Sequence, residues 1–300
     1  MTVDQDISRR KCFALSLLTF LGYNFLVIAW GAWVRISFSG DGCGKSWPLC
    51  DDQFIPQAAD MAQWIEWSHR LSTGIFGLVA LTLFFWGRKL YPKKHPVRTS
   101  LIFMLLFTLS EALIGAALVK LELVGNNASI FRAWAIGFHQ INSLALTLCI
   151  FLSFMQAQTL HELHPKFKFA FKLLLLFLSG VAFTGALAAL AGTLYPSMNL
   201  ITGFLADINS ASPLLIRLRL SHPVLASLFC LLSFVWLLKQ QEAFSSRKFS
   251  LLGSYLIVAL SFGWATLLNL SPVWMKLLHL CLAHGTIIAL SYAFLIAKKA

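Results

Sequence analysis

Long apolar runs alternate with short polar connections along the whole chain. A helix needs about 20 apolar residues to cross roughly 30 Å of hydrocarbon, and each run has about that length. The pattern predicts an all-α membrane protein with eight spanning helices, over Phe13–Val34, Trp64–Trp86, Leu101–Val119, Ile130–Phe154, Leu173–Ala191, Ile216–Leu238, Leu251–Leu268 and Val273–Ala297.

Basic residues divide the connections between these runs into two sets. Of the 24 Lys and Arg, 16 lie in the N-terminal segment, in every second connection and at the C-terminal end. Cytoplasmic segments of membrane proteins are enriched in Lys and Arg, so we expect both termini to be cytoplasmic in a multi-pass protein of a prokaryotic plasma membrane. The connections expected to face outward are 35–63, 120–129, 192–215 and 269–272.

The composition supports a membrane location. Hydrophobic residues make up 58% of the chain and charged residues only 12%, whereas about a quarter of the residues in a soluble domain are charged. The net charge of +12 would suggest a nucleic-acid partner in a soluble protein, but these basic residues cluster between apolar runs and indicate topology instead. The expected partner is the lipid bilayer and not a nucleic acid.

The spacing of small residues and histidines indicates an internal duplication. Gly31 and Gly185 lie 154 residues apart, and His69 and His222 lie 153 residues apart. Four spans return the chain to the side on which it started, so we expect two tandem four-helix bundles related by a pseudo-twofold repeat. One bundle is expected over residues 1–160 and the other over residues 161–300.

Four histidines lie at a similar depth in the even-numbered spans. His69, His139, His222 and His279 are about 8–14 Å from the outward end of their helices. Imidazole is costly in hydrocarbon without a partner, and pairs of axial imidazoles suit haem iron. The alternative is that each histidine hydrogen-bonds a neighbouring helix. His284 points about 140° away from His279 and is expected to be packed or to face the lumen.

Two cysteines enclose a short segment of the first outer connection. The segment between Cys43 and Cys50 contains Gly and Pro, which permit a tight loop, and an outward location favours a disulfide. The pair is either a structural disulfide or a redox-active or substrate-gating one.

Several segments, distributed over nearly all of the chain, resemble those of one family. They are GAWVRISFSGDGCGKSWPLC (31–50), WIEWSHRLSTG (64–74), SEALIGAALVKLELVGNNASIFRA (110–133), FHQINS (138–143), LYPSMNLITGF (194–204), PLLIRLRLSHPVLA (213–226) and WMKLLHLCLAHG (274–285). These segments resemble the haem A synthases, which are membrane enzymes of terminal-oxidase cofactor biosynthesis.

The resemblance implies a reaction and two haem sites. The reaction is oxidation of the C8 methyl group of haem O to a formyl group by successive hydroxylation, which gives haem A. The resemblance places the substrate haem O between His69 and His139 in the first bundle. It places a haem b prosthetic group between His222 and His279 in the second bundle.

Charged residues near these histidines are further candidates. The family's Glu-x-x-His motif makes Glu66 the leading catalytic candidate as a proton acceptor, and the alternative is a structural pair with Arg70 or the helix dipole. Glu111, in the third span, suits either a proton path or an interhelical hydrogen bond. Guanidinium groups form hydrogen-bonded ion pairs with carboxylates and therefore suit the propionates of a haem. The alternative is that each arginine extends its side chain to the membrane interface. The candidate propionate ligands are Arg35, Arg70, Arg132, Arg217 and Arg219.

Two other functional classes remain open at this point. A dihaem cytochrome b that only transfers electrons needs the same four histidines but neither Glu66 nor the cysteine pair. A transporter with a midplane polar site predicts broken helices and central charges. The expected protein partners of an enzyme are haem O synthase and a membrane electron donor or acceptor. The oxidant and the oligomeric state are left open, a homo-oligomer included.

Overall fold

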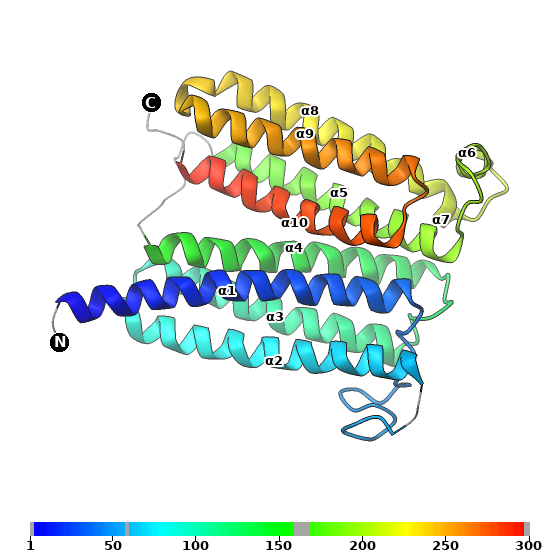
Figure 1. Ribbon diagram of the computed structural model, residues 1–300, viewed down its shortest axis with the longest axis horizontal. Coiled ribbons are helices and arrows are strands. Elements are labelled where there is room, and N and C mark those ends of the chain that lie inside the picture. Colours follow the sequence, from blue (N-terminus) through cyan, green and yellow to red (C-terminus); the bar gives the residue numbers. More distant parts are fainter. Residues whose placement is uncertain (1–2, 58–59, 159–167, 297–300) are drawn as a thin grey trace. The chain divides into compact units, whose positions relative to one another are not determined.

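The computed structural model describes residues 3–57, 60–158 and 168–296, and the regular elements among these residues are helices. Eight of the helical segments are long and apolar enough to cross a membrane, which confirms the predicted number. The long helices in Figure 1 are α1 (Val3–Ile36), α2 (Met61–Leu90), α3 (Pro96–Lys120), α4 (Ile130–Gln158), α5 (Lys168–Leu194), α8 (Ser221–Lys239), α9 (Ser246–Leu268) and α10 (Val273–Ile296).

The sixth predicted span is not one continuous α-helix. It consists of α7 (Leu214–Arg217), a single 3₁₀ turn, η2 (Leu218–Leu220), and then α8. Pro223 lies in the first turn of α8 and has no N–H group for the carbonyl four residues earlier, which accounts for a change of helix type at this point. The break places His222 at the start of a new helix. A second short 3₁₀ turn, η3 (Gln241–Ala243), precedes α9.

The outer connection over residues 192–215 contains a helix that the sequence pattern did not predict. This helix, α6 (Leu200–Ile208), begins after Asn199, whose side chain accepts a hydrogen bond from the Thr202 amide at 2.9 Å. An asparagine in this capping position satisfies one of the free amide groups at a helix start.

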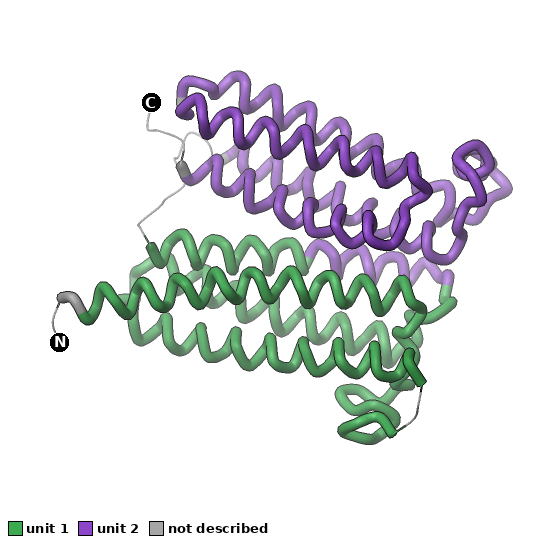
Figure 2. The backbone as a smooth tube through the Cα atoms, viewed as in Figure 1, with its two compact units in different colours: residues 1–127, 142–161 green, residues 128–141, 162–300 purple. Residues whose placement is uncertain are grey.

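The described residues form two compact units, coloured separately in Figure 2, and the division runs through α4. Residues 1–127 and 142–161 belong to the first unit, and residues 128–141 and 162–300 belong to the second. The predicted boundary between residues 160 and 161 lies outside the described residues, as do His161 and His164. The pseudo-twofold relation between two bundles stays a prediction.

In the first unit, α2 packs against both α1 and α3. The last two-thirds of α4 joins them through polar side chains. Asn24 of α1 donates to Thr147 of α4 at 2.9 Å, and Ser100 of α3 donates to Gln156 of α4 at 2.8 Å. Such hydrogen bonds between apolar helices hold neighbours together where hydrocarbon offers no competing partner.

In the second unit, α5, α8, α9 and α10 form a four-helix arrangement in which α5 packs on both α8 and α10. The first turns of α4 pack against α5 and α7. The cluster of buried residues at that contact contains Ala133, Leu187, Leu190, Ala191 and Leu215.

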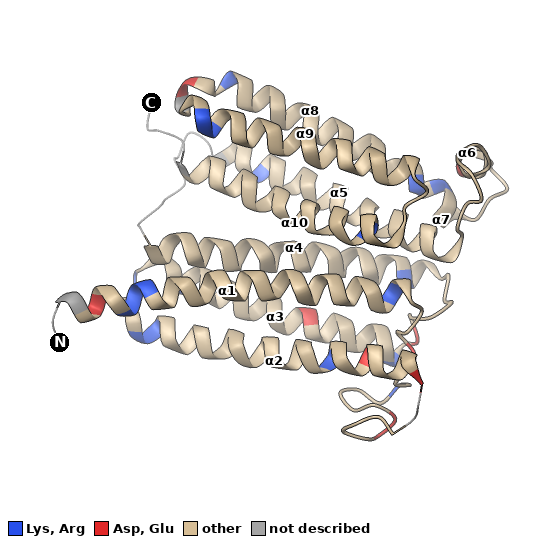
Figure 3. Cartoon of the chain, viewed as in Figure 1, with Lys and Arg blue, Asp and Glu red and all other residues tan. Residues whose placement is uncertain are grey.

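Side chains on the outer helix faces are apolar and exposed. Leu26 of α1 and Leu78 of α2 are each 68% exposed, which an aqueous surface would disfavour and a lipid environment accepts. Charged residues lie mainly towards the helix ends within each unit (Figure 3). The protein is therefore a multi-pass membrane protein, while the side on which the termini lie stays a prediction.

Candidate functional site

Helices α8 and α10 bring two of the predicted histidines together. The ring centres of His222 and His279 lie 6.0 Å apart, with ring planes at 72°. Two imidazoles on opposite sides of one metal ion have ring centres about 6 Å apart, because each metal–nitrogen bond is about 2 Å and each nitrogen lies about 1 Å from its ring centre. The pair therefore has the separation that a shared iron requires.

The hydrogen bonding of this pair leaves ligand nitrogens available. His222 donates from Nδ1 to the carbonyl oxygen of Val181 at 3.1 Å, and this tautomer leaves the lone pair of Nε2 free. A backbone acceptor of this kind orients metal-binding histidines. Nδ1 of His279 is buried and has no hydrogen-bond partner among the described residues. Buried nitrogen without a partner is costly and marks this position as one that suits a ligand.

Glycines on neighbouring helices allow the imidazoles to lie close to the backbone. A Cβ atom on Gly185 of α5 would lie 2.8 Å from the ring of His222, and one on Gly263 of α9 would lie 2.9 Å from the ring of His279. Both distances are shorter than real Cβ contacts, so any larger residue would displace the ring. The two glycines therefore fix where the imidazoles sit.

His69 has the same kind of neighbour in the first unit. A Cβ atom on Gly31 of α1 would lie 3.0 Å from the His69 ring. His139 lies in the part of α4 that belongs to the second unit. The pairing of His69 with His139 stays a prediction.

Glu66 is buried one helical turn before His69 and is 3% exposed. Its carboxylate accepts a hydrogen bond from the Cys43 amide at 2.8 Å and forms an ion pair with Arg70. The sequence left open a purely structural role for Glu66 as an ion-pair partner of Arg70, and this ion pair is present. A role in proton transfer stays a prediction.

Arg70 connects α2 to the cysteine loop. Besides its pair with Glu66, the guanidinium donates to the carbonyl oxygens of Ser46, at 2.8 Å, and Leu49. Cys43 and Cys50 form a disulfide, as predicted. The loop is thus closed by a covalent bond, and hydrogen bonds that join its backbone to Glu66 and Arg70 hold it over the start of α2.

Arg219 has a corresponding role in the second unit. It forms an ion pair with Asp207 of α6, from Nε at 2.8 Å and Nη2 at 2.6 Å, and donates to the Gly203 carbonyl at 3.1 Å. These contacts fasten α6 to the turn before His222. Arg217 is exposed and Arg132 is buried.

The predicted contacts of the five arginines with propionates stay predictions. Arg35 is half-buried at the end of α1, where the outer connection begins. For Arg70 and Arg219, a contact with a propionate would compete with the protein partners just described.

Two polar side chains inside the helices, His284 and Glu111, have partners that the sequence did not identify. His284 is fully buried, as expected of a packed histidine, and Gln140 of α4 donates to its Nε2 at 3.0 Å. Glu111 of α3 accepts a hydrogen bond from Asn142 of α4, which is the interhelical bond that one alternative for Glu111 proposed. Gln140 and Asn142 follow His139 on the same helix, one and three positions later. A single polar residue in an apolar run reveals its depth but not its partner, so the sequence could not identify the Gln140–His284 and Glu111–Asn142 pairs.

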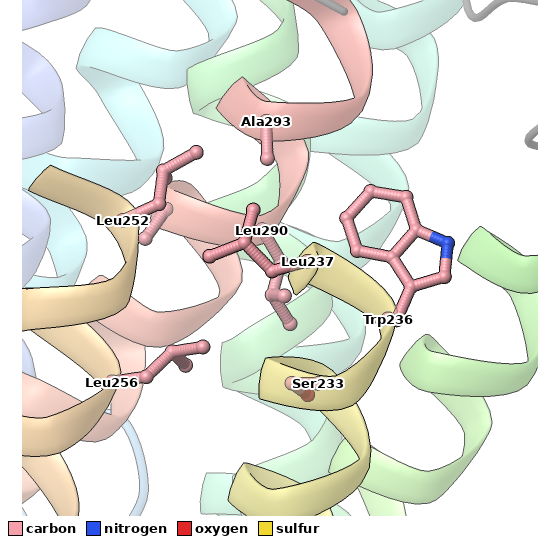
Figure 4. A pocket seen from close by; sticks show the side chains of 8 residues that line it. Ser233, Trp236, Leu237, Leu252, Leu256, Leu290 and Ala293 are labelled. Carbon is pink, nitrogen blue, oxygen red and sulfur yellow. The ribbon is translucent and has the colours of Figure 1, made fainter. Parts of the chain in front are cut away.

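An apolar pocket in the second unit is separate from the histidines. Side chains of α8, α9 and α10 surround it (Figure 4), and no histidine is among them. Its lining consists of Ser233, Trp236, Leu237, Leu252, Leu256, Ala289, Leu290 and Ala293.

Comparison with known proteins gives one family. The model of the COX15-CtaA family, described as "Cytochrome oxidase assembly protein", matches residues 14–291. A "Heme A synthase" of Shouchella clausii is 31% identical over 241 residues, which are 76% of this chain and 77% of that protein. A "Heme A synthase" of Bacillus cereus is 40% identical over 94 residues, 31% of this chain and 30% of that protein.

A longer relative carries a different name. A "Protoheme IX farnesyltransferase" of Thermus thermophilus is 32% identical over 271 residues. The match covers 88% of this chain but 45% of the relative, so the chain spans about half the length of that protein.

Proposed function

This chain belongs to the COX15-CtaA family of cytochrome oxidase assembly proteins, and from that premise we propose that it is a haem A synthase. The proposed reaction is oxidation of the C8 methyl group of haem O to a formyl group. The observation that carries the proposal is the His222–His279 pair, whose ring separation suits a shared iron. The match to the "Heme A synthase" of Shouchella clausii, which covers 77% of that protein, supports the same function.

His222 and His279 would hold a haem b prosthetic group. The available Nε2 of His222, the buried Nδ1 of His279 and the glycines beside both rings fit such a group. When bound, haem b supplies a one-electron redox centre. The chain's own contribution is to orient both imidazoles and to exclude water, through the Val181 carbonyl and the close helix packing.

His69 and His139 would hold haem O as substrate. With water as the source of the oxygen atom, conversion of a methyl group to a formyl group releases four electrons and four protons. Glu66 would accept protons released near His69, because its carboxylate lies on the same helix face one turn away. The Cys43 amide and Arg70 hold that carboxylate in place, which is the preorganisation that proton transfer requires.

The disulfide loop would cover the entrance to the substrate site. Hydrogen bonds join its backbone to Glu66 and Arg70, and Trp67 donates to the Phe54 carbonyl at 2.7 Å. In this account the disulfide is structural and keeps the loop over the first turns of α2. Arg35 and Arg132 would bind haem propionates, since guanidinium groups pair with carboxylates and both residues stand at helix ends.

The membrane arrangement and the protein partners complete the proposal. The basic connections would be cytoplasmic, which places the disulfide loop on the oxidising side of a prokaryotic plasma membrane. The Thermus relative is a longer protein, and one segment of it is similar to this chain. Its name refers to farnesyl transfer to protohaem. This supports a partnership with the enzyme that makes haem O. Electrons would pass to a membrane acceptor.

Extraction of haems after expression tests the proposed function. The protein is expressed in cells that make haem O but no haem A, and extracted haems are separated by chromatography. We expect haem A from the wild type and from the control His95→Ala, whose histidine lies before α3. We expect none from His69→Ala. Haem b with unchanged haem O would instead favour the electron-transferring cytochrome.

A further inference from the structure

Helix α10 carries two histidines that point in different directions. His279 lies beside His222, and His284 contacts Gln140 of α4. Five residues separate the two histidines, which corresponds to a rotation of about 140° and a rise of about 7 Å. One helix therefore bears a predicted haem ligand on one face and a contact with α4 on another.

The contact with α4 is fully enclosed. His284 is 0% exposed, and an imidazole buried among apolar helices needs a hydrogen-bond partner. The Gln140 amide supplies one at 3.0 Å. Loss of either side chain would leave the other without this bond, so the pair favours one arrangement of α4 on α10.

Close packing on α5 restrains the same segment of α4. A Cβ atom on Gly137 would lie 2.3 Å from the Phe183 ring, and Trp134 and Phe138 both contact that ring, with centroids 5.3 Å and 5.7 Å away. The aromatic contacts fix the distance of α4 from α5. The Gln140–His284 hydrogen bond fixes its rotation, because a directional bond tolerates little turning of the helix.

His139 immediately precedes Gln140, so the direction of its imidazole depends on the rotation of α4. We propose that Gln140 and His284 are positioning residues for His139. The ligand predicted for the substrate haem would then take its orientation from the helix that carries His279. This inference rests on the proposed function, since it assumes that His139 binds haem.

Haem spectroscopy tests the positioning role without measuring activity. Wild type, Gln140→Leu, His284→Gln and the control Thr286→Val are purified with haem b in both sites, and ferric low-spin signals are recorded by electron paramagnetic resonance. The Thr286 hydroxyl donates to the carbonyl oxygen of Leu282 on the same helix at 3.0 Å. Signals are assigned to their sites with His139→Ala and His279→Ala.

We expect Gln140→Leu to shift the signal that depends on His139 and to weaken haem retention at that site about tenfold. The signal that depends on His279 should be unchanged. His284→Gln, which can still bond Gln140, should retain more of the wild-type signal, and Thr286→Val should match wild type. Unchanged signals in Gln140→Leu, or equal loss of both signals in both variants, would overturn the positioning role. A wild type that binds haem only at the His222–His279 pair would overturn the proposed substrate site as well.

Discussion

In the first compact unit His69 of α2 lies against Gly31 of α1, and in the second His222 of α8 lies against Gly185 of α5. A Cβ atom on either glycine would come within 3.0 Å or 2.8 Å of the imidazole. The local packing is thus similar in both helix pairs: a histidine in the first turns of one helix lies against a glycine of the long helix that precedes it.

The residue three positions before each histidine differs in sign. Glu66 precedes His69, and Arg219 precedes His222. Each forms an ion pair: the buried Glu66 with Arg70, and the partly buried Arg219 with Asp207. The first pair holds a disulfide loop and the second holds a short helix.

This difference separates the two predicted roles. A carboxylate near the first histidine can accept protons, which an oxidation that releases protons needs. Arg219 occupies the corresponding position in the second unit. A permanently bound haem at His222 and His279 would release no protons from a substrate and would need no carboxylate to accept them. We therefore expect changes at the two positions to have different consequences.

The largest effect should come from Glu66→Gln. The amide oxygen can still accept the Cys43 N–H bond, but the side chain no longer accepts a proton, so haem A formation should fall at least about hundredfold while both haems remain bound. Product chromatography and the optical spectrum measure the two quantities. Arg219→Gln should cause a much smaller loss of product, through loosening of α6. Equal losses in the two variants would remove the distinction between the sites.

The glycine contacts predict an intermediate effect on haem retention. Gly185→Ala places a methyl group in contact with the His222 ring and should weaken haem binding at that site about tenfold. Gly31→Ala should do the same at the His69 site. Gly192 of α5 and Gly22 of α1 have nothing within 4 Å of an added Cβ atom and provide matched controls. Haem loss to apomyoglobin measures retention, and equal rates for Gly185→Ala and Gly192→Ala would contradict the packing argument.

The disulfide predicts a smaller effect, on stability. Cys43→Ser opens the loop over α2 and should lower the stability of the first unit by about 2 kcal/mol, with haem A formation reduced but present. Cys12→Ser, which changes an exposed free thiol, is the control. Thermal unfolding followed at the haem bands gives the comparison. If product formation stops while stability is unchanged, the cysteine pair is redox-active.

The eight helices could be predicted because each apolar run is long enough to span a bilayer. α6 was missed because its nine residues are too few to span a bilayer, and the prediction identified helices only by apolar runs of spanning length. The change of helix type before His222 had a signal in Pro223, whose missing N–H group weakens a helix at that point.

The sequence predicted which residue types form the candidate site, but only some of the contacts that these residues make. Depth identified His222 and His279 as candidates, because an imidazole is costly in hydrocarbon without a partner. The partners of Glu66 could not be read fully: Arg70 is four residues away on one helix, but the Cys43 amide reaches Glu66 only after the loop has folded. Gln140 likewise meets His284 through packing of helices that are far apart in sequence.

Haem stoichiometry in single-histidine variants tests the central claim most directly, which is that paired imidazoles bind one haem in each half of the chain. Protein loaded with haem is purified and the haem per chain is measured by the pyridine haemochrome method. We predict two haems in wild type, one in His69→Ala or His139→Ala, and one in His222→Ala or His279→Ala, with different spectra remaining in the two groups. Two haems in every variant, or the same spectrum remaining whichever histidine is replaced, would contradict the account.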